Sequence, residues 1–247
     1  MSYINLQPVI VYGPVGSKRL KKSLGINLLP ADKKVCTFNC IYCHYGPTYV
    51  GKYQLPTPQA IESALKERIS NNEEFDYITF AGNGEPTLHP QFLEISEIVK
   101  DLRDTLAPNV PIALISNSTF LWKNEVIEAL NNIDLPILKL DAGDEETFNL
   151  VNRPVNMLEV KQIIENLSAI KNCIIQTVFL EGRVKNYCGN SFEKWLDAMV
   201  KISPKLIQIY SPDNPMPEEN IIPLEIEKLR EIAETISISI DAEVTAY

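Results

Sequence analysis

Hydrophobic residues along the chain follow two alternating patterns. Short apolar runs, typical of buried strands, are separated by longer segments in which apolar residues recur every three or four positions, as on one face of a helix. The strand-like runs cover residues 23–29, 76–81, 111–116, 135–141, 173–180 and 205–210. The first helical segment begins at Thr57-Pro58, an N-cap followed by a proline at the first helical position. The other helical segments cover residues 90–103, 123–130, 157–170, 191–202 and 223–236.

This order of elements predicts an α/β fold. Strands that alternate with helices pair in parallel, because each helix carries the chain back to the same end of the sheet. The pattern by itself allows either an open sheet or a barrel. No linker, composition shift or internal repeat interrupts the alternation, so we expect one domain.

Two of the predicted strands have an unexpectedly polar face. Lys139 and Asp141 alternate with leucines, and Gln208 and Tyr210 alternate with isoleucines. A buried lysine or aspartate is costly unless it is paired or used. These four residues therefore indicate a ligand cavity, although an internal ion pair between Lys139 and Asp141 would also explain the first strand.

The cysteines indicate a metal site. Three of the five lie close together as Cys36, Cys40 and Cys43, in a C-x3-C-x2-C arrangement after the first strand. An odd number with this crowding is a poor disulfide framework. Thiolates are ligands for zinc or iron–sulfur clusters, and three of them would leave one iron of a four-iron cluster open. A zinc site completed by His44 as Cys3His is the alternative.

Composition and charge narrow the functional class. Hydrophobic residues make up 45% and charged residues 22% of the 247 residues, which excludes a disordered or fibrous protein. The net charge of −9 disfavours a protein that mainly coats nucleic acid or anionic membranes. We see no secretory leader, and the longest charge-free stretch, 105–122, contains two prolines. We therefore expect a soluble, cytoplasmic protein that does not act at a membrane.

These motifs resemble those of the radical S-adenosylmethionine superfamily. The cysteine spacing, with Tyr42 just before the third cysteine, is similar to the signature of that family. The segment 82–90, Gly-Asn-Gly-Glu-Pro-Thr-Leu-His-Pro, resembles its glycine-glycine-glutamate motif in the G-x-G-E-P form. Residues 13–20, 23–30, 140–148 and 152–154 resemble the small stand-alone subgroup related to tRNA wyosine-base synthases.

The resemblance implies a fold and a reaction. It implies that residues 1–247 form one radical S-adenosylmethionine domain. The core of this domain would be a partial (β/α)6 barrel at about residues 20–212, preceded by a strand segment at 1–19 and followed by a helix and a strand at 213–247. The motifs all follow predicted strand ends, where α/β folds place their sites. The implied cofactors are a [4Fe–4S] cluster and S-adenosylmethionine, whose reductive cleavage yields a 5′-deoxyadenosyl radical. Such an oxidoreductase is oxygen-sensitive.

The resemblance also implies a role for individual residues. Cys36, Cys40 and Cys43 would bind the cluster, while Lys139 and Asp141 would be the catalytic residues. The remaining cofactor contacts fall on residues next to the motifs or at strand ends. The backbone around Asn83 and Gly84, with Glu85, would hold the methionine amino group, and Ser116 and Asn117 would bind the ribose or methionine end. Lys139 or Arg153 would pair with the cofactor carboxylate, and Asp141 would bind ribose or substrate. Tyr42 would lie beside the adenine, and Tyr210 stands at the end of the last parallel strand.

Several functions remain open at this point. The leading one is hydrogen abstraction from an unidentified small-molecule or modified-nucleoside substrate, with a flavodoxin or ferredoxin as electron donor. A wyosine-type tRNA enzyme is disfavoured by the negative charge, and a glycyl-radical activating enzyme by segments 140–148 and 152–154. A non-catalytic Cys3His zinc module is the alternative from another class. Cys173 and Cys188 have no assigned role.

Overall fold

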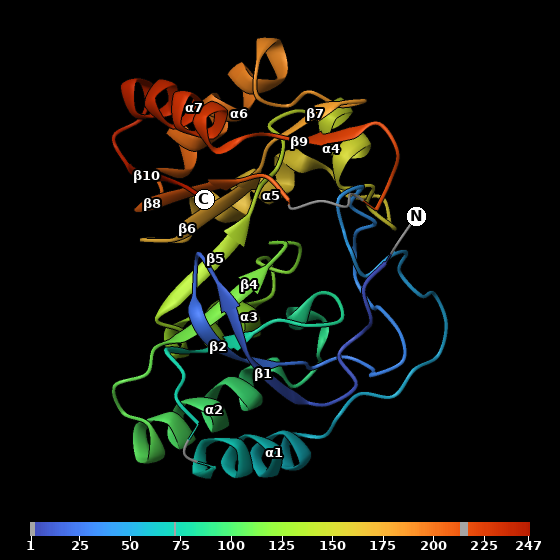
Figure 1. Cartoon of the computed structure of the whole chain (residues 1–247), viewed down its shortest axis with the longest axis vertical. Helices are drawn as coiled ribbons and strands as arrows, with labels where there is room; N and C mark the ends of the chain where they lie inside the picture. The colour runs from blue at the N-terminus through green and yellow to red at the C-terminus, as the bar shows by residue number, and fades with distance from the viewer. Residues whose placement is uncertain (1–2, 72, 213–216) are drawn as a thin grey trace. The chain divides into compact units, whose positions relative to one another are not determined.

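The computed structural model describes residues 3–71, 73–212 and 217–247 (Figure 1). They form two compact units. The N-terminal unit comprises Asn5–Cys36 and Pro47–Pro136, and the C-terminal unit comprises residues 3–4, Thr37–Gly46 and Ile137–Tyr247. The predicted single domain stays a prediction, and its proposed boundary at residue 213 lies outside the described residues.

The N-terminal unit is a sheet of four strands with helices between them. The strand order is β1-β2-β3-β4, in which β1 is antiparallel to β2 and the other pairs are parallel. Its elements are β1 (Val11–Ser17), β2 (Lys21–Ile26), α1 (Pro58–Ser70), β3 (Tyr77–Phe80), η1 (Pro86–Leu88), α2 (Phe92–Leu106), β4 (Ile112–Ser116), α3 (Asn124–Ala129) and η2 (Leu130–Asn132). The predicted N-cap of α1 is confirmed, since Thr57 Oγ1 accepts a hydrogen bond from the backbone N–H of Ala60.

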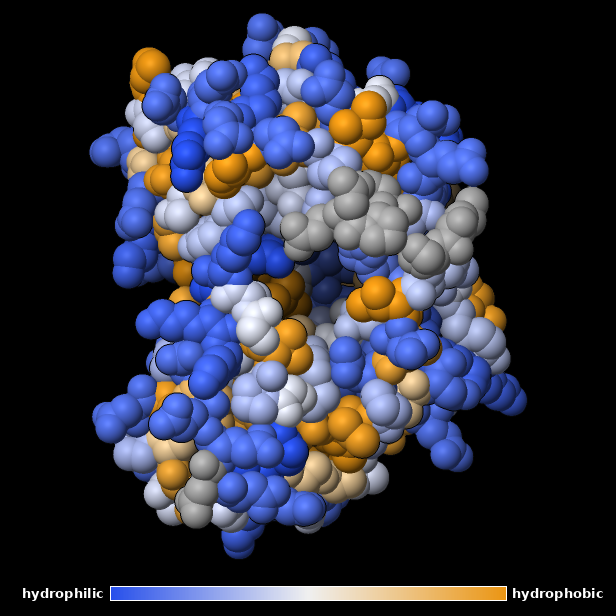
Figure 2. Space-filling view, viewed as in Figure 1, coloured by the Kyte–Doolittle hydropathy of each residue, from blue (hydrophilic) through white to orange (hydrophobic). Residues whose placement is uncertain are grey.

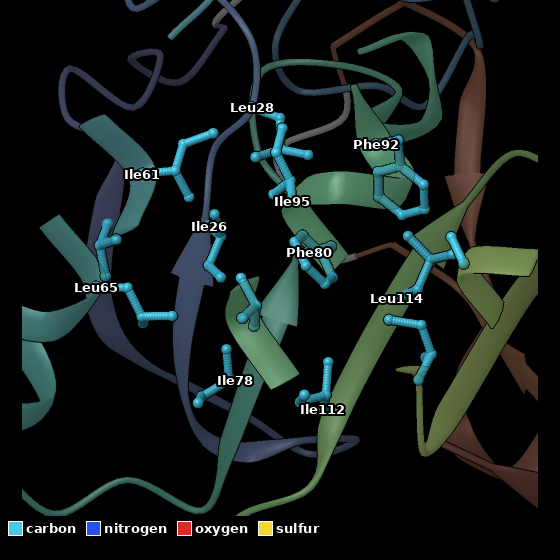
Figure 3. Close-up of a cluster of buried hydrophobic side chains, with 14 residues drawn as sticks. Ile26, Leu28, Ile61, Leu65, Ile78, Phe80, Phe92, Ile95, Ile112 and Leu114 are labelled. Atoms are coloured by element: carbon cyan, nitrogen blue, oxygen red, sulfur yellow. The ribbon is translucent and has the colours of Figure 1, made fainter. Parts of the chain in front are cut away.

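Apolar side chains from the strands and from two helices make the core of this unit. Figure 3 shows Ile61 and Leu65 of α1, and Phe92 and Ile95 of α2, lying over the strands. The strand residues in the same cluster include Ile26, Ile78, Phe80, Ile112 and Leu114, all fully buried. Complete burial of each such side chain contributes roughly 1.5–3 kcal/mol, so this core holds the strand ends in place.

The C-terminal unit is a parallel sheet with a separate two-stranded ribbon. From Ile137 onward the strand order is β5-β6-β8-β10, all parallel, while β7 and β9 form an antiparallel pair. The elements are β5 (Leu135–Lys139), α4 (Glu145–Val151), α5 (Val160–Ser168), β6 (Ile174–Val178), β7 (Leu180–Gly182), α6 (Gly189–Ile202), β8 (Leu206–Tyr210), β9 (Ile221–Pro223), α7 (Ile226–Ser239) and β10 (Glu243–Ala246).

The predicted fold class is confirmed. The six predicted strands are observed as β2, β3, β4, β5, β6 and β8, and helices connect them in the predicted order. Two boundaries were wrong for identifiable reasons. Strand β2 ends at Ile26 because the Asn27 side chain bonds both the N–H and the carbonyl of Leu29, which turns the chain. The run 173–180 divides into β6 and the start of β7.

The predicted polar face runs across several strands of the C-terminal unit. Lys139 is in register with Gln176, which in turn is in register with Gln208. The Gln176 amide donates to Gln208 Oε1 over 2.9 Å, which pairs these two buried side chains with each other. The ion pair weighed as an alternative is also present, since Lys139 Nζ lies 3.5 Å from Asp141 Oδ1.

The face shown in Figure 2 is largely hydrophilic, with hydrophobic residues in scattered patches. Within the described ranges, no helix combines the length and the apolar character that are needed to cross a bilayer.

A buried histidine should make the stability of the protein sensitive to acid. His89 is almost fully buried, with Nε2 3.0 Å from the carbonyl oxygen of Pro56 and Nδ1 accepting from the N–H of Gln91. Burial lowers the pKa of His89 below its ordinary value of 6.5. The unfolded chain therefore takes up a proton first, and stability is lost as the pH falls below about 6.5 toward the lower folded-state pKa.

We expect the free energy of unfolding to decrease between pH 7 and pH 5 because of this residue. Urea titrations of wild type and His89→Gln across that range measure the difference. An unchanged pH dependence in His89→Gln would contradict the assignment.

Candidate functional site

The glycine motif of the N-terminal unit pairs with the chain that enters the cysteine loop. Val35 N–H donates to the carbonyl of Asn83 over 2.8 Å, and Glu85 N–H donates to the carbonyl of Val35 over 3.1 Å. Gly84 has φ of +142°, and a Cβ there would lie 1.8 Å from the carbonyl oxygen of Val35. Only glycine fits this approach, so Gly84 fixes the backbone immediately before Cys36.

The Asn83 side chain is committed to backbone groups of its own unit. Its Nδ2 donates to the carbonyls of Gln7 and Pro30, and its Oδ1 accepts from the N–H of Gln7. Asn83 is completely buried. Its side chain therefore holds the segments around the motif, and the binding of a cofactor amino group by its backbone stays a prediction.

Glu85 links the glycine motif to the end of β4. Its carboxylate accepts hydrogen bonds from the N–H and hydroxyl of Thr87, from Ser116 Oγ at 2.8 Å and from the Asn117 N–H at 2.7 Å. Burial raises the pKa of Glu85, and these donors oppose that effect. The predicted residues Glu85, Ser116 and Asn117 are thus brought together.

Asn117 extends this network to the first cysteine. Its Oδ1 accepts from both the N–H and the hydroxyl of Thr119, and its Nδ2 lies 3.5 Å from Cys36 Sγ. Thr119 was not predicted from the sequence, since a threonine in a loop carries no signal of its own. The N-terminal unit therefore brings together Cys36, the glycine motif and the end of β4.

The other two cysteines lie in the C-terminal unit, in a loop held by the end of α4. Asn39 N–H donates to the carbonyls of Asn152 and Arg153, and Ile41 N–H donates to the carbonyl of Val151. Phe38 packs edge-on against Phe148 of α4, with 5.4 Å between ring centroids. These contacts explain why the segment 152–154 accompanies the cysteine motif: it is the backbone support of the loop that carries Cys40 and Cys43.

Asp141 is the centre of a buried polar network in the same unit. Oδ2 accepts hydrogen bonds from the Tyr42 hydroxyl and, over 2.7 Å, from Asn152 Nδ2, while Oδ1 accepts from the Val178 N–H over 2.9 Å. Asp141 is 2% exposed. Its carboxylate thus orients Tyr42 and Asn152. The pKa of the Tyr42 hydroxyl is raised mainly by burial, and the negative charge of Asp141 raises it further.

Lys139 places a half-buried cation close to two tyrosine rings. Its Nζ lies 5.2 Å from the ring centroid of Tyr42 and 5.0 Å from that of Tyr210, and donates to the Tyr210 hydroxyl over 3.1 Å. Burial acts to lower the pKa of Lys139, but the charge of Asp141 and the bond to Tyr210 outweigh it, so the pKa is raised. Tyr42, Lys139, Asp141 and Tyr210 thus form one cluster.

Arg153 pairs with Glu218 and not with a member of that cluster. Its guanidinium makes a bidentate pair with Glu218, with Nη2 2.9 Å from Oε2. Arg183 lies 3.8 Å from the same carboxylate. Glu218 was not predicted, because it is distant in sequence from every motif. Binding of a cofactor carboxylate to Arg153 would have to compete with Glu218.

The cysteines differ in their suitability as metal ligands. Cys36, Cys40 and Cys43 are partly exposed, whereas Cys173 is buried, which raises its pKa to about 11 and keeps it a thiol. The three thiolates fit an iron–sulfur cluster by the softness of their sulfur donors. Within the part of the chain that the structure describes, no three histidine, cysteine or acidic side chains are grouped as ligands of a single metal ion.

Comparison with known proteins gives a consistent family. A model described as the Radical SAM superfamily matches residues 33–194. A UPF0026 protein of Methanocaldococcus jannaschii is 35% identical over 233 residues, covering 90% of this chain and 70% of that protein.

Solved structures agree on the fold. The structure of TYW1 with a lysine–pyruvate adduct bound has a TM-score of 0.65 at 16% identity, covering 91% of this chain and 76% of that chain. Streptococcus suis SuiB bound to S-adenosylmethionine has a TM-score of 0.66 at 14% identity, covering 90% and 50%. The family model extends over both the cysteine motif and the glycine motif. The chain therefore belongs to the radical SAM superfamily and to the UPF0026 proteins.

Proposed function

We propose that this protein binds a [4Fe–4S] cluster through Cys36, Cys40 and Cys43 and uses it with S-adenosylmethionine to abstract hydrogen from a small-molecule or modified-nucleoside substrate. The observation that carries the proposal is the three-cysteine motif inside the region matched by the superfamily model. Membership of the superfamily implies enzymatic radical chemistry with an iron–sulfur cluster and S-adenosylmethionine. The reduced cluster supplies the electron that cleaves the cofactor to methionine and a 5′-deoxyadenosyl radical.

The residues around the cysteines have distinct tasks in this proposal. Gly84 and Glu85 hold the backbone next to Cys36 and present it to the methionine amino group. Lys139 supplies a fixed positive charge for an anionic group of cofactor or substrate. Asp141 keeps that charge in place and orients Tyr42 and Asn152, which supports a positioning role. Its contact with ribose or substrate stays a prediction. Burial of this network excludes water from it.

Spectroscopy of the reduced protein tests the proposal. The full chain is purified without oxygen, reconstituted with iron and sulfide and reduced with dithionite. We expect a [4Fe–4S]+ electron paramagnetic resonance signal that changes when S-adenosylmethionine is added, followed by slow formation of 5′-deoxyadenosine. A protein that holds one zinc and no iron after reconstitution would overturn the enzyme proposal in favour of the Cys3His module.

A second candidate is a wyosine-type tRNA enzyme, favoured by the shared fold with TYW1. The net charge of −9 opposes it. A tRNA shift on a native gel that weakens steeply with salt would support this candidate.

The charge of Lys139 gives a further prediction. Lys139→Ala should weaken the binding of S-adenosylmethionine at least tenfold, or about 1.4 kcal/mol, because a half-buried cation is lost while Asp141 keeps its other three donors. Equilibrium dialysis of the reconstituted protein with labelled cofactor measures this.

The matched control is Lys185→Ala, since Lys185 also pairs with a carboxylate and lies over a tyrosine ring, but at an exposed position. Its affinity should equal that of wild type. If the affinity for S-adenosylmethionine is unchanged in both Lys139→Ala and Arg153→Ala, neither residue binds the cofactor carboxylate.

A further inference from the structure

Two asparagine amides point at cysteine sulfurs, one in each unit. In the N-terminal unit Asn117 Nδ2 lies 3.5 Å from Cys36 Sγ, and in the C-terminal unit Asn152 Nδ2 lies 3.5 Å from Cys40 Sγ. Both asparagines are buried, at 8% and 3% exposure. Each distance is that of an N–H···S hydrogen bond, so each unit supplies a donor to one of the proposed cluster ligands.

The direction of the Asn117 amide is set by its neighbours. Thr119 donates to Oδ1 twice, from its N–H over 3.1 Å and from its hydroxyl over 2.6 Å. The backbone N–H of Asn117 is held by Glu85 over 2.7 Å. With Oδ1 occupied by two donors, the nitrogen end of the amide faces Cys36.

Asn152 is oriented by a carboxylate instead. Its Nδ2 donates to Asp141 Oδ2 over 2.7 Å as well as lying near Cys40. A flipped amide would turn its oxygen toward two acceptors, which is unfavourable. Its Oδ1 is buried without a hydrogen-bond partner among the described residues. The orientation of the Asn152 amide therefore favours the two contacts of Nδ2, although it leaves Oδ1 without a hydrogen bond among the described residues.

We propose that Asn117 and Asn152 are positioning residues that raise the reduction potential of the cluster by donating hydrogen bonds to the sulfurs of Cys36 and Cys40. This inference rests on the proposed function. Reduction adds one electron to the cluster, and part of the added negative charge lies on its cysteine sulfurs. A donor at a sulfur stabilises the reduced form more than the oxidised form, and hydrogen bonds of this kind are known to set cluster potentials.

Potentiometric titration tests the proposal. The reconstituted full chain is titrated with dithionite and redox mediators, and the [4Fe–4S]+ signal is recorded at each potential. Asn117→Leu and Asn152→Leu keep a similar side-chain volume and remove the donor. We expect the midpoint potential of the cluster to fall in each variant by up to about 59 mV. For one electron, this corresponds to a tenfold decrease in the equilibrium constant for reduction. A midpoint equal to that of wild type in both variants would overturn the inference.

Two other buried asparagines are matched controls. Asn27 bonds Leu29 and the N–H of Asn83 in the N-terminal unit, and Asn186 bonds Leu180, Val178 and the carbonyl of Asp141 in the C-terminal unit. Neither has a cysteine among these partners. Asn27→Leu and Asn186→Leu should lower the stability and leave the midpoint potential unchanged. A fall in the controls equal to that in the test variants would show that loss of packing, and not loss of the donor, moves the potential.

A measurement on the wild-type chain covers the case in which the test variants do not fold. Protein prepared with asparagine labelled with ¹⁵N in the side-chain amide is reduced and studied by pulsed electron paramagnetic resonance. A coupling between the cluster and the labelled nitrogen is expected. A cluster without this coupling overturns the inference alone, whereas a wild-type chain that binds no iron overturns the proposed function.

Discussion

Replacing Cys43 by alanine is expected to abolish cluster binding and, with it, the formation of 5′-deoxyadenosine. Three thiolates are the minimum for a site of this kind, and Cys173 is not suited to replace the third. Cys173 is buried, and its raised pKa of about 11 keeps it protonated. Iron content after reconstitution, the [4Fe–4S]+ signal and product formation should all fall to background.

The matched control is Cys188→Ala, because Cys188 is exposed and has no assigned role. It should keep wild-type iron content and activity. The Cys43→Ala chain should remain folded, since the loop is held by backbone bonds such as that from the Ile41 N–H to Val151, and circular dichroism checks this. Full iron content in Cys43→Ala would contradict the assigned ligand set.

Among substitutions that add one methyl group to the N-terminal unit, Gly84→Ala is expected to lower the stability of the protein most. The added Cβ would lie 1.8 Å from the carbonyl oxygen of Val35, which is a backbone atom and cannot rotate away, and the φ of +142° is one that alanine rarely adopts. Strain and overpacking together should cost about 3 kcal/mol or more. Denaturant unfolding measures the loss, and the variant should also reconstitute poorly, because Val35 precedes Cys36.

Gly16→Ala in β1 is the control for this substitution. No atom lies within 4 Å of the Cβ that would be added there, so its stability should remain within about 0.5 kcal/mol of wild type. Equal stability of Gly84→Ala and Gly16→Ala would mean that the pairing of Gly84 with Val35 does not constrain the chain.

The fold could be predicted because local patterns and long-range structure agree in this chain. Each of the six parallel strands is an apolar run, and each is followed by a segment with helical spacing. The misplaced boundaries arose where a side chain overrides the pattern, as Asn27 does at the end of β2. The ribbon of β7 and β9 was missed because three-residue strands are too short to show a period.

The candidate site could be predicted only as a set of residues. Spacing identified the cysteines and the glycine motif, and alternation identified Lys139 and Asp141 as polar residues in a buried strand. Which atoms these residues contact depends on partners far away in the chain, such as Tyr42 for Asp141 and Glu218 for Arg153. No local pattern encodes such pairs. The assigned roles in cofactor binding accordingly stay proposals.

The support of the cysteine loop by residues 151–155 bears on how the cofactor enters the protein. Thr37, Asn39 and Ile41 are tied to this segment by backbone hydrogen bonds, and Ile41 is buried in an apolar cluster. These bonds need no metal, in contrast to small zinc domains that are unfolded without their ion. We therefore expect folding to order this loop before the cluster binds, so that insertion of the cluster is a separate, later step.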